Sequence, residues 1–146
     1  MKLSPTAGMQ GISWATETFV GKATEAISKG NIVECTLTAL EPDGDQEVSL
    51  SNADSFGIYA VALEDIASGE TGLCALSGKV EVLGGGDVAA GVRFMPNATG
   101  KAVEHSGTGN NNVCCGIAVD TLSANNLGTV LFDGWQAITA QDQTPD

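Results

Sequence analysis

The residues of this chain that could do chemistry are few and scattered. The only histidine, His105, lies beside a polar loop, and the sequence has neither a second histidine for a metal pair nor a serine in a nucleophile-elbow motif. Five carboxylates lie near predicted strand ends: Glu64, Asp65, Glu70, Asp120 and Asp133. Their spacing in the sequence does not bring any two of them to the separation that acid–base catalysis requires. We therefore expect no enzyme activity, no cofactor, and a solvated loop histidine.

Two short motifs resemble ligand-binding loops but lack a required residue. Residues 43–47 place alternate carboxylates as a calcium loop does, yet Val48 stands where the loop needs glycine, and no helix is predicted to follow. Residues 84–86 are three glycines that could approach a phosphate, but Asp87 would repel it and no Gly-Lys-Ser/Thr sequence follows. Both motifs are predicted to be turns.

The four cysteines do not have the spacing of a metal site. Cys35 and Cys74 are isolated, and the adjacent Cys114 and Cys115 would point to opposite faces of a strand. The N-terminus lacks the continuous apolar stretch of a secretory signal. We expect synthesis in the cytoplasm and reduced, mostly buried thiols that bind no metal.

Charge and composition restrict the class of partner. A formal net charge of −12 with only 6 basic residues excludes nucleic acid, because affinity for phosphate depends on lysine and arginine. The apolar runs are strand-sized and broken by glycine, so no membrane partner is expected. With 42% hydrophobic and 16% charged residues, the chain should fold.

The elements that would position any functional residue are predicted to be strands. A strand–turn–strand pattern with glycines in its turn occurs over residues 56–82 and again over residues 115–132. We interpret the two copies as adjacent walls of one antiparallel β-barrel, which makes the chain all-β. The predicted domains are an extended N-terminal arm (1–18), the barrel (19–134) and a polar C-terminal tail (135–146).

The arm holds the candidate binding residues. Pro5, Gly8 and Gly11 oppose independent folding there, although several residues in and next to the arm are too apolar to be left in water: Ile12, Trp14, Phe19 and Val20. Such a segment can add as a strand to the exposed sheet edge of another molecule. The alternative is that Trp14 folds back onto its own barrel.

Four segments, at residues 26–33, 57–70, 76–82 and 116–119, resemble the capsid cement, or head decoration, proteins of tailed bacteriophages. The resemblance spans about residues 19–132 in the right order. It implies a compact β-barrel or β-tulip, usually a homotrimer, on the outer surface of the expanded head. There the family stiffens the shell against DNA pressure, and its arms pair with the major capsid protein. It supplies no active-site residue.

Two other functions remain open from the sequence. A carbohydrate-binding β module of a tail fibre or baseplate would use Trp14, Trp135 or Tyr59 as a stacking platform, although only 5% of the residues are aromatic. A small β-barrel hydrolase would depend on His105, for which no partner residue is evident.

Overall fold

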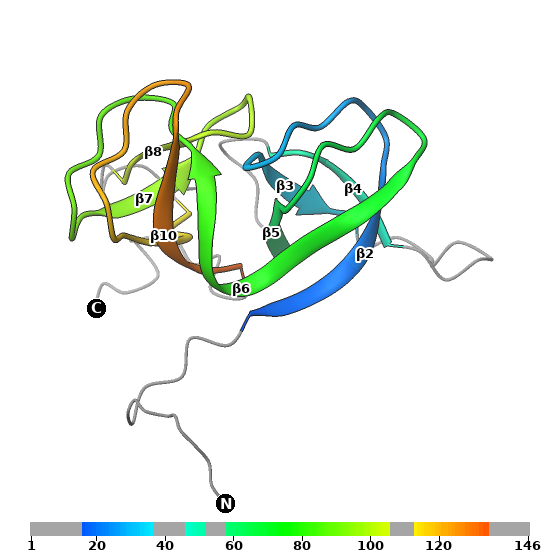
Figure 1. The fold of residues 1–146 in the computed structure, drawn as a ribbon, viewed down its shortest axis with the longest axis horizontal. Coiled ribbons are helices and arrows are strands. Elements are labelled where there is room, and N and C mark those ends of the chain that lie inside the picture. Colours follow the sequence, from blue (N-terminus) through cyan, green and yellow to red (C-terminus); the bar gives the residue numbers. More distant parts are fainter. Residues whose placement is uncertain (1–15, 37–45, 52–57, 106–112, 135–146) are drawn as a thin grey trace, which may run out of the picture.

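The protein is all-β, as the sequence predicts. The computed structural model describes residues 16–36, 46–51, 58–105 and 113–134 (Figure 1). In those residues every regular element is a strand: β2 (Glu17–Ala23), β3 (Ile32–Cys35), β4 (Gln46–Leu50), β5 (Ile58–Ala62), β6 (Thr71–Leu83), β7 (Arg93–Pro96), β8 (Ala102–Glu104), β9 (Gly116–Ala118) and β10 (Leu127–Asp133). The same ranges contain no helix long and apolar enough to cross a membrane.

Five strands close into a barrel, here called the first unit. They follow the order β2-β4-β3-β5-β6, and β6 pairs with β2 to complete the ring. Most neighbours are antiparallel, but residues Gly21–Ala23 of β2 run parallel to residues 46–48 of β4. Where the ring is closed, each strand has a neighbour on both sides. Such closure lowers the risk that strand edges of different molecules pair and aggregate. The ring fills one side of Figure 1.

The long strand β6 leaves this barrel and enters a second group of strands. Residues 71–77 pair with β2, and residues 77–83 pair with β10. Glu17 lies opposite Ser77 but Thr18 lies opposite Ala75, so Leu76 is an extra residue that bends the strand. This bend directs the second half of β6 away from the first unit (Figure 1).

The second half of β6 starts another ring, here called the second unit. Its order is β6-β10-β9-β7-β8, and a single parallel bridge from Gly84 to Ala102 joins the end of β6 to β8. The expectation that the doubled strand–turn–strand pattern forms walls of one barrel therefore holds only in part. β6 and β10 are neighbours, but β9 and β10 lie outside the first ring.

The two units are structural repeats of one another. Four turns start from a buried apolar residue, and these residues bridge in antiparallel pairs: Ile27 with Ile66, and Val88 with Leu122. The fourth residue of each turn has a positive φ: Gly30 (88°), Gly69 (84°), Gly91 (85°) and Asn125 (65°). When the two units are aligned on these turns, the strands β2, β3, β4, β5 and β6 of the first unit correspond, in that order, to β6, β7, β8, β9 and β10 of the second unit. The aligned strands also have the same neighbours.

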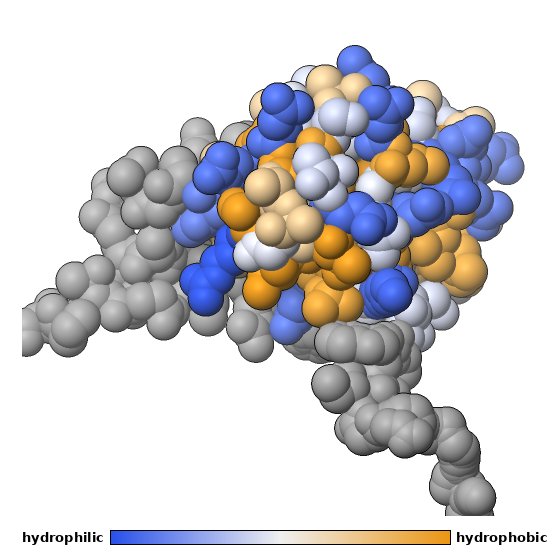
Figure 2. All heavy atoms as spheres, turned by 60° about the vertical axis from the view of Figure 1, so that its left-hand side comes forward, coloured by the Kyte–Doolittle hydropathy of each residue, from blue (hydrophilic) through white to orange (hydrophobic). Residues whose placement is uncertain are grey.

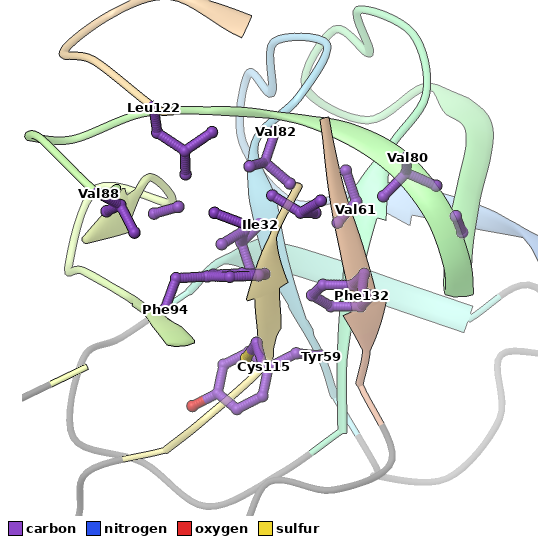
Figure 3. Close-up of a cluster of buried hydrophobic side chains, with 14 of the residues drawn as sticks. Ile32, Tyr59, Val61, Val80, Val82, Val88, Phe94, Cys115, Leu122 and Phe132 are labelled. Atoms are coloured by element: carbon purple, nitrogen blue, oxygen red, sulfur yellow. The ribbon is translucent and has the colours of Figure 1, made fainter. Parts of the chain in front are cut away.

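Two hydrophobic clusters share β5. Ala60 and Ala62 point into the first barrel with Val33 and Cys74, whereas Val61 points the other way, into the larger cluster. The larger cluster fills the second unit, and its Phe94 and Phe132 rings stack at 6.4 Å between centroids (Figure 3). β5 is therefore buried on both faces, which joins the two units into one packed body.

Candidate interaction surface

The outer face of the β2–β6 pair carries exposed apolar side chains. Val20 is 50% exposed and Leu73 is 40% exposed, and the two residues are directly paired across the strands. Single exposed apolar residues are common on protein surfaces, but an adjacent pair forms a small contiguous patch. Thr18 and Lys22 of β2 and Thr71 of β6 flank this patch. We call these five residues the β2–β6 face.

Of the residues expected to contact a partner, the structure describes Phe19 and Val20. They are consecutive in β2, so their side chains point to opposite faces of the strand. Phe19 is half-buried against the core cluster of the first unit, and Val20 faces solvent. Ile12 and Trp14 lie outside the described residues. Leu73 was not predicted as a contact residue. It lies two residues from Thr71 and two from Ala75, so all three side chains are on the same face of β6.

In the part of the chain that the structure describes, the first half of β2 is paired along one edge only. β2 pairs with β6 from Glu17 to Lys22, but its pairing with β4 begins only at Gly21. Among the described residues, the backbone from Glu17 to Val20 is therefore paired on one side only. An edge of this kind can accept another strand, because its N–H and C=O groups need partners.

Polar contacts hold this face in place. The backbone N–H of Leu73 donates to Glu64 Oε2 at 2.8 Å, and the hydroxyl of Ser77 donates to Glu17 Oε1 at 3.3 Å. Glu64 therefore ties the loop after β5 to the start of β6. Asp65 has a similar role, since its Oδ1 accepts from the backbone N–H of Lys29 at 2.8 Å.

Comparison with known proteins identifies the family. A sequence model of the phage cement protein family matches residues 22–133. The chain belongs to the phage cement protein family. A search of the curated proteins finds no match. Among solved structures, the chain is similar to the N base of the head fibre gp8.5 in bacteriophage phi29. The TM-score is 0.61 with 19% identity, covering 82% of this chain and 95% of that one.

Family membership establishes the coarse role of this cement protein. It is a structural component of a phage virion, and its partner is the capsid. The family is not a class of enzymes. At 19% identity, the likeness to the head-fibre base shows only that the two proteins share a fold.

The structure corrects two expectations about candidate residues of this cement protein. Tyr59 is fully buried in the larger cluster (Figure 3), so it cannot stack on a carbohydrate ring as the carbohydrate-binding alternative supposed. His105 is half-buried instead of solvated. Its backbone N–H donates to the Arg93 carbonyl at 3.0 Å, and its Nε2 is shielded from solvent. Within the described ranges, no group of three metal-ligating side chains comes together.

The cysteines of the cement protein are free thiols. Cys35, Cys74 and Cys115 are buried, and Cys114 is half-buried, in agreement with the predicted structural role. Burial, and then the neighbouring Cys74 and Glu34, raises the pKa of Cys35 to about 12. Burial and then Glu64 raises the pKa of Cys74 to about 11, against a lowering contribution from a hydrogen bond with the Gly21 backbone. Burial likewise raises the pKa of Cys115. All three buried thiols stay protonated at neutral pH.

Proposed function

We propose that this cement protein binds the outer surface of the expanded phage head and stabilises the shell against the pressure of packaged DNA. It acts as a homotrimer made in the host cytoplasm, and its direct partner is the major capsid protein. The contact is made by the arm and the start of β2, through Ile12, Trp14, Phe19 and Val20. The observation that carries the proposal is the edge of Glu17–Val20 with which no described residue pairs, beside the exposed Val20–Leu73 pair.

The edge and the apolar pair provide two kinds of binding energy. A strand of the capsid protein that pairs with Glu17–Val20 would satisfy the backbone groups along this edge, and its register would be set by alternate side chains. Covering Val20 and Leu73 removes apolar surface from water, and full burial of such a side chain is worth about 1.5 to 3 kcal/mol. Three arms acting together would increase the affinity well beyond that of one arm.

The charge of the chain favours the outer surface of the head over the lumen. With 18 acidic and 6 basic residues, the protein would be repelled by packaged DNA. The same charge favours solubility of the unassembled protein.

Co-sedimentation with DNA-free heads tests the binding site. Wild-type protein should bind expanded heads and not unexpanded ones, whereas Val20→Glu should bind expanded heads at least about tenfold more weakly, because it places a charge in the apolar contact. The matched control is Ala90→Glu, which adds the same charge to an exposed turn of the second unit and should bind as wild type does. Equal binding by Val20→Glu and wild type would show that the β2–β6 face does not contact the head.

Heating DNA-filled particles tests the stabilising role. Particles with the bound protein should release DNA at a higher temperature than particles without it. The Val20→Glu variant should give little protection at a concentration that saturates binding of the wild type. Identical release temperatures with and without bound wild-type protein would contradict stabilisation against DNA pressure.

A further inference from the structure

The second unit presents a row of four side chains on its outer surface. The pairing of β7, β9, β10 and β6 aligns Arg93, Ile117, Leu131 and Lys79 directly across the sheet. Arg93 and Lys79 are exposed, Ile117 is 40% exposed and Leu131 is half-buried. Figure 2 brings forward the side of the molecule formed by the second unit, where hydrophobic side chains gather among hydrophilic ones. We call these four residues the second-unit row.

The first unit contains the equivalent row at the same positions of the repeat. There the pairing aligns Ile32, Val61, Ala75 and Thr18 across β3, β5, β6 and β2. Counted from the four repeated turns, Ile32 corresponds to Arg93, Val61 to Ile117, Ala75 to Leu131 and Thr18 to Lys79. The two rows are thus one structural feature of the repeat, present once in each unit.

Three of the four residues in the row of the first unit are covered and the fourth, Thr18, is exposed, whereas no residue in the row of the second unit is fully buried. Ile32, Val61 and Ala75 are all 0% exposed, because they belong to the cluster that fills the second unit. Figure 3 shows Ile32 and Val61 pointing into that cluster. Within one chain, therefore, this face of the repeat is buried against another copy of the same repeat.

We propose that the second-unit row binds a second copy of this chain in a head-to-tail contact. The covered residues of the first-unit row provide the precedent, since their occupant is a unit of the same fold. The proposal deepens the homotrimer of the proposed function, on which it rests, by assigning the surface that joins the copies.

The charges of the row favour this occupant. Arg93 and Lys79 are two of the 6 basic residues of the chain. In the described ranges, neither has a carboxylate partner within ion-pair distance. Another copy offers carboxylates to these cations, because the described part of the first unit has five exposed acidic residues: Glu17, Glu25, Glu64, Asp65 and Glu70. Oppositely charged surfaces select the partner and its orientation.

The same charges oppose a symmetric contact of the row with itself. Both ends of the row are cationic, so a two-fold axis would bring cation against cation along its length. A head-to-tail contact instead places the row against a different surface of the neighbour. Such a contact either closes into a ring or continues as a filament, and closure gives a cyclic oligomer.

Light scattering coupled to size-exclusion chromatography of the full chain tests the assignment. The wild type should run as an oligomer, at about 44 kDa for a trimer of the 14.8 kDa chain. Ile117→Glu should shift the mass to that of one chain, because it introduces a charge at the centre of the row. Ala90→Glu, which adds the same charge to an exposed turn outside the row, should keep the oligomeric mass. A monomeric wild type, or an oligomeric Ile117→Glu, would overturn the proposal.

A second variant keeps the test decisive if Ile117→Glu fails to fold. The double variant Arg93→Glu/Lys79→Glu changes only exposed side chains and reverses both end charges. It should dissociate at a concentration at least about tenfold higher than the wild type. An unchanged dissociation constant would overturn the proposal. Raising the salt from about 0.1 M to about 1 M should also weaken the wild-type oligomer, since the screening length falls from about 10 Å to about 3 Å.

The head-binding assay separates this proposal from the proposed function. A wild type that is monomeric yet binds expanded heads would overturn the assigned interface and leave capsid binding intact. A wild type that is oligomeric yet fails to bind expanded heads would contradict the proposed function and leave the interface intact.

Discussion

At the scale of single residues, burial determines the chemistry of the cysteines. Cys35 of β3 and Cys74 of β6 both point into the first barrel, where a thiolate would lose its hydration. The raised pKa values, about 12 for Cys35 and about 11 for Cys74, follow chiefly from this burial. These thiols act as small apolar side chains that fill the barrel.

The raised pKa values predict a loss of stability at alkaline pH. A group whose pKa is higher in the folded state stabilises the fold below its unfolded pKa of 9.0, and this contribution disappears as the pH rises toward the folded value. Each thiol should therefore cost about 1 kcal/mol of the free energy of unfolding for each pH unit above 9. The melting temperature, measured under reducing conditions, should fall steadily from pH 9 upward.

Removing the two thiols provides the control for this prediction. The double variant Cys35→Ala/Cys74→Ala should start from a lower melting temperature, because it leaves small cavities in the barrel. Its further decline above pH 9 should be shallower than that of the wild type. Parallel declines in the two proteins would show that other groups cause the alkaline loss.

The sequence predicted residue properties better than residue partnerships. The burial of Cys35 and Cys74 follows from their place in apolar strands, and it was predicted. The pairing of Val20 with Leu73 was not predicted, because the register between β2 and β6 joins residues that are far apart in the chain. The sequence names Tyr59 as a possible stacking platform from its residue type alone, and it gives no sign that the face of β5 on which Tyr59 lies is packed. The second unit covers that face.

At the scale of elements, the repeated turns depend on one backbone conformation. The fourth residue of each turn has a positive φ, a conformation that β-branched side chains rarely adopt. Gly69 takes this position at a φ of 84°, and Asn125 takes it in the second unit at 65°. A Cβ added at Gly69 would meet nothing within 4 Å, so the backbone conformation alone decides which residues fit.

This equivalence predicts how substitutions at Gly69 are tolerated. Gly69→Asn should lower the free energy of unfolding by less than about 1 kcal/mol, since asparagine tolerates the left-handed region. Gly69→Val should lower it by about 2 kcal/mol or more, because of its branched Cβ. Urea denaturation of the two variants measures the difference. Equal losses would indicate that the turn opens without strain, and the alignment of the repeats would lose its support at this position.

The strands themselves could be predicted more readily than their arrangement. Apolar runs and turn glycines predicted strands within residues 56–82 and 115–132, where the structure has β5, β6, β9 and β10, because these signals are local. The closure of the first ring depends on the parallel pairing of β2 with β4, and the second unit depends on the bend of β6 at Leu76. Both features arise from contacts between distant segments, which no local pattern records.

At the scale of the whole molecule, the two units share their strands and their core. β6 contributes seven residues to its pairing with β10 and also closes the first ring. Val61 of β5 belongs to the larger cluster, while its neighbours Ala60 and Ala62 belong to the cluster of the first barrel. A packing defect at β5 therefore disturbs both units, which is the condition for cooperative unfolding.

Val61→Ala tests this cooperativity. Val61 is 0% exposed, and its truncation should lower the free energy of unfolding by about 1 to 3 kcal/mol through lost contacts and a residual cavity. Because the units unfold together, hydrogen exchange of the most protected amides should accelerate by the same factor in β4 of the first unit and in β10 of the second. That factor is about tenfold for each 1.4 kcal/mol.

The control Val119→Ala truncates the same side chain at a 40% exposed position and should leave both rates nearly unchanged. Acceleration confined to β4 or to β10 would show that the repeats unfold as separate domains despite their shared strand.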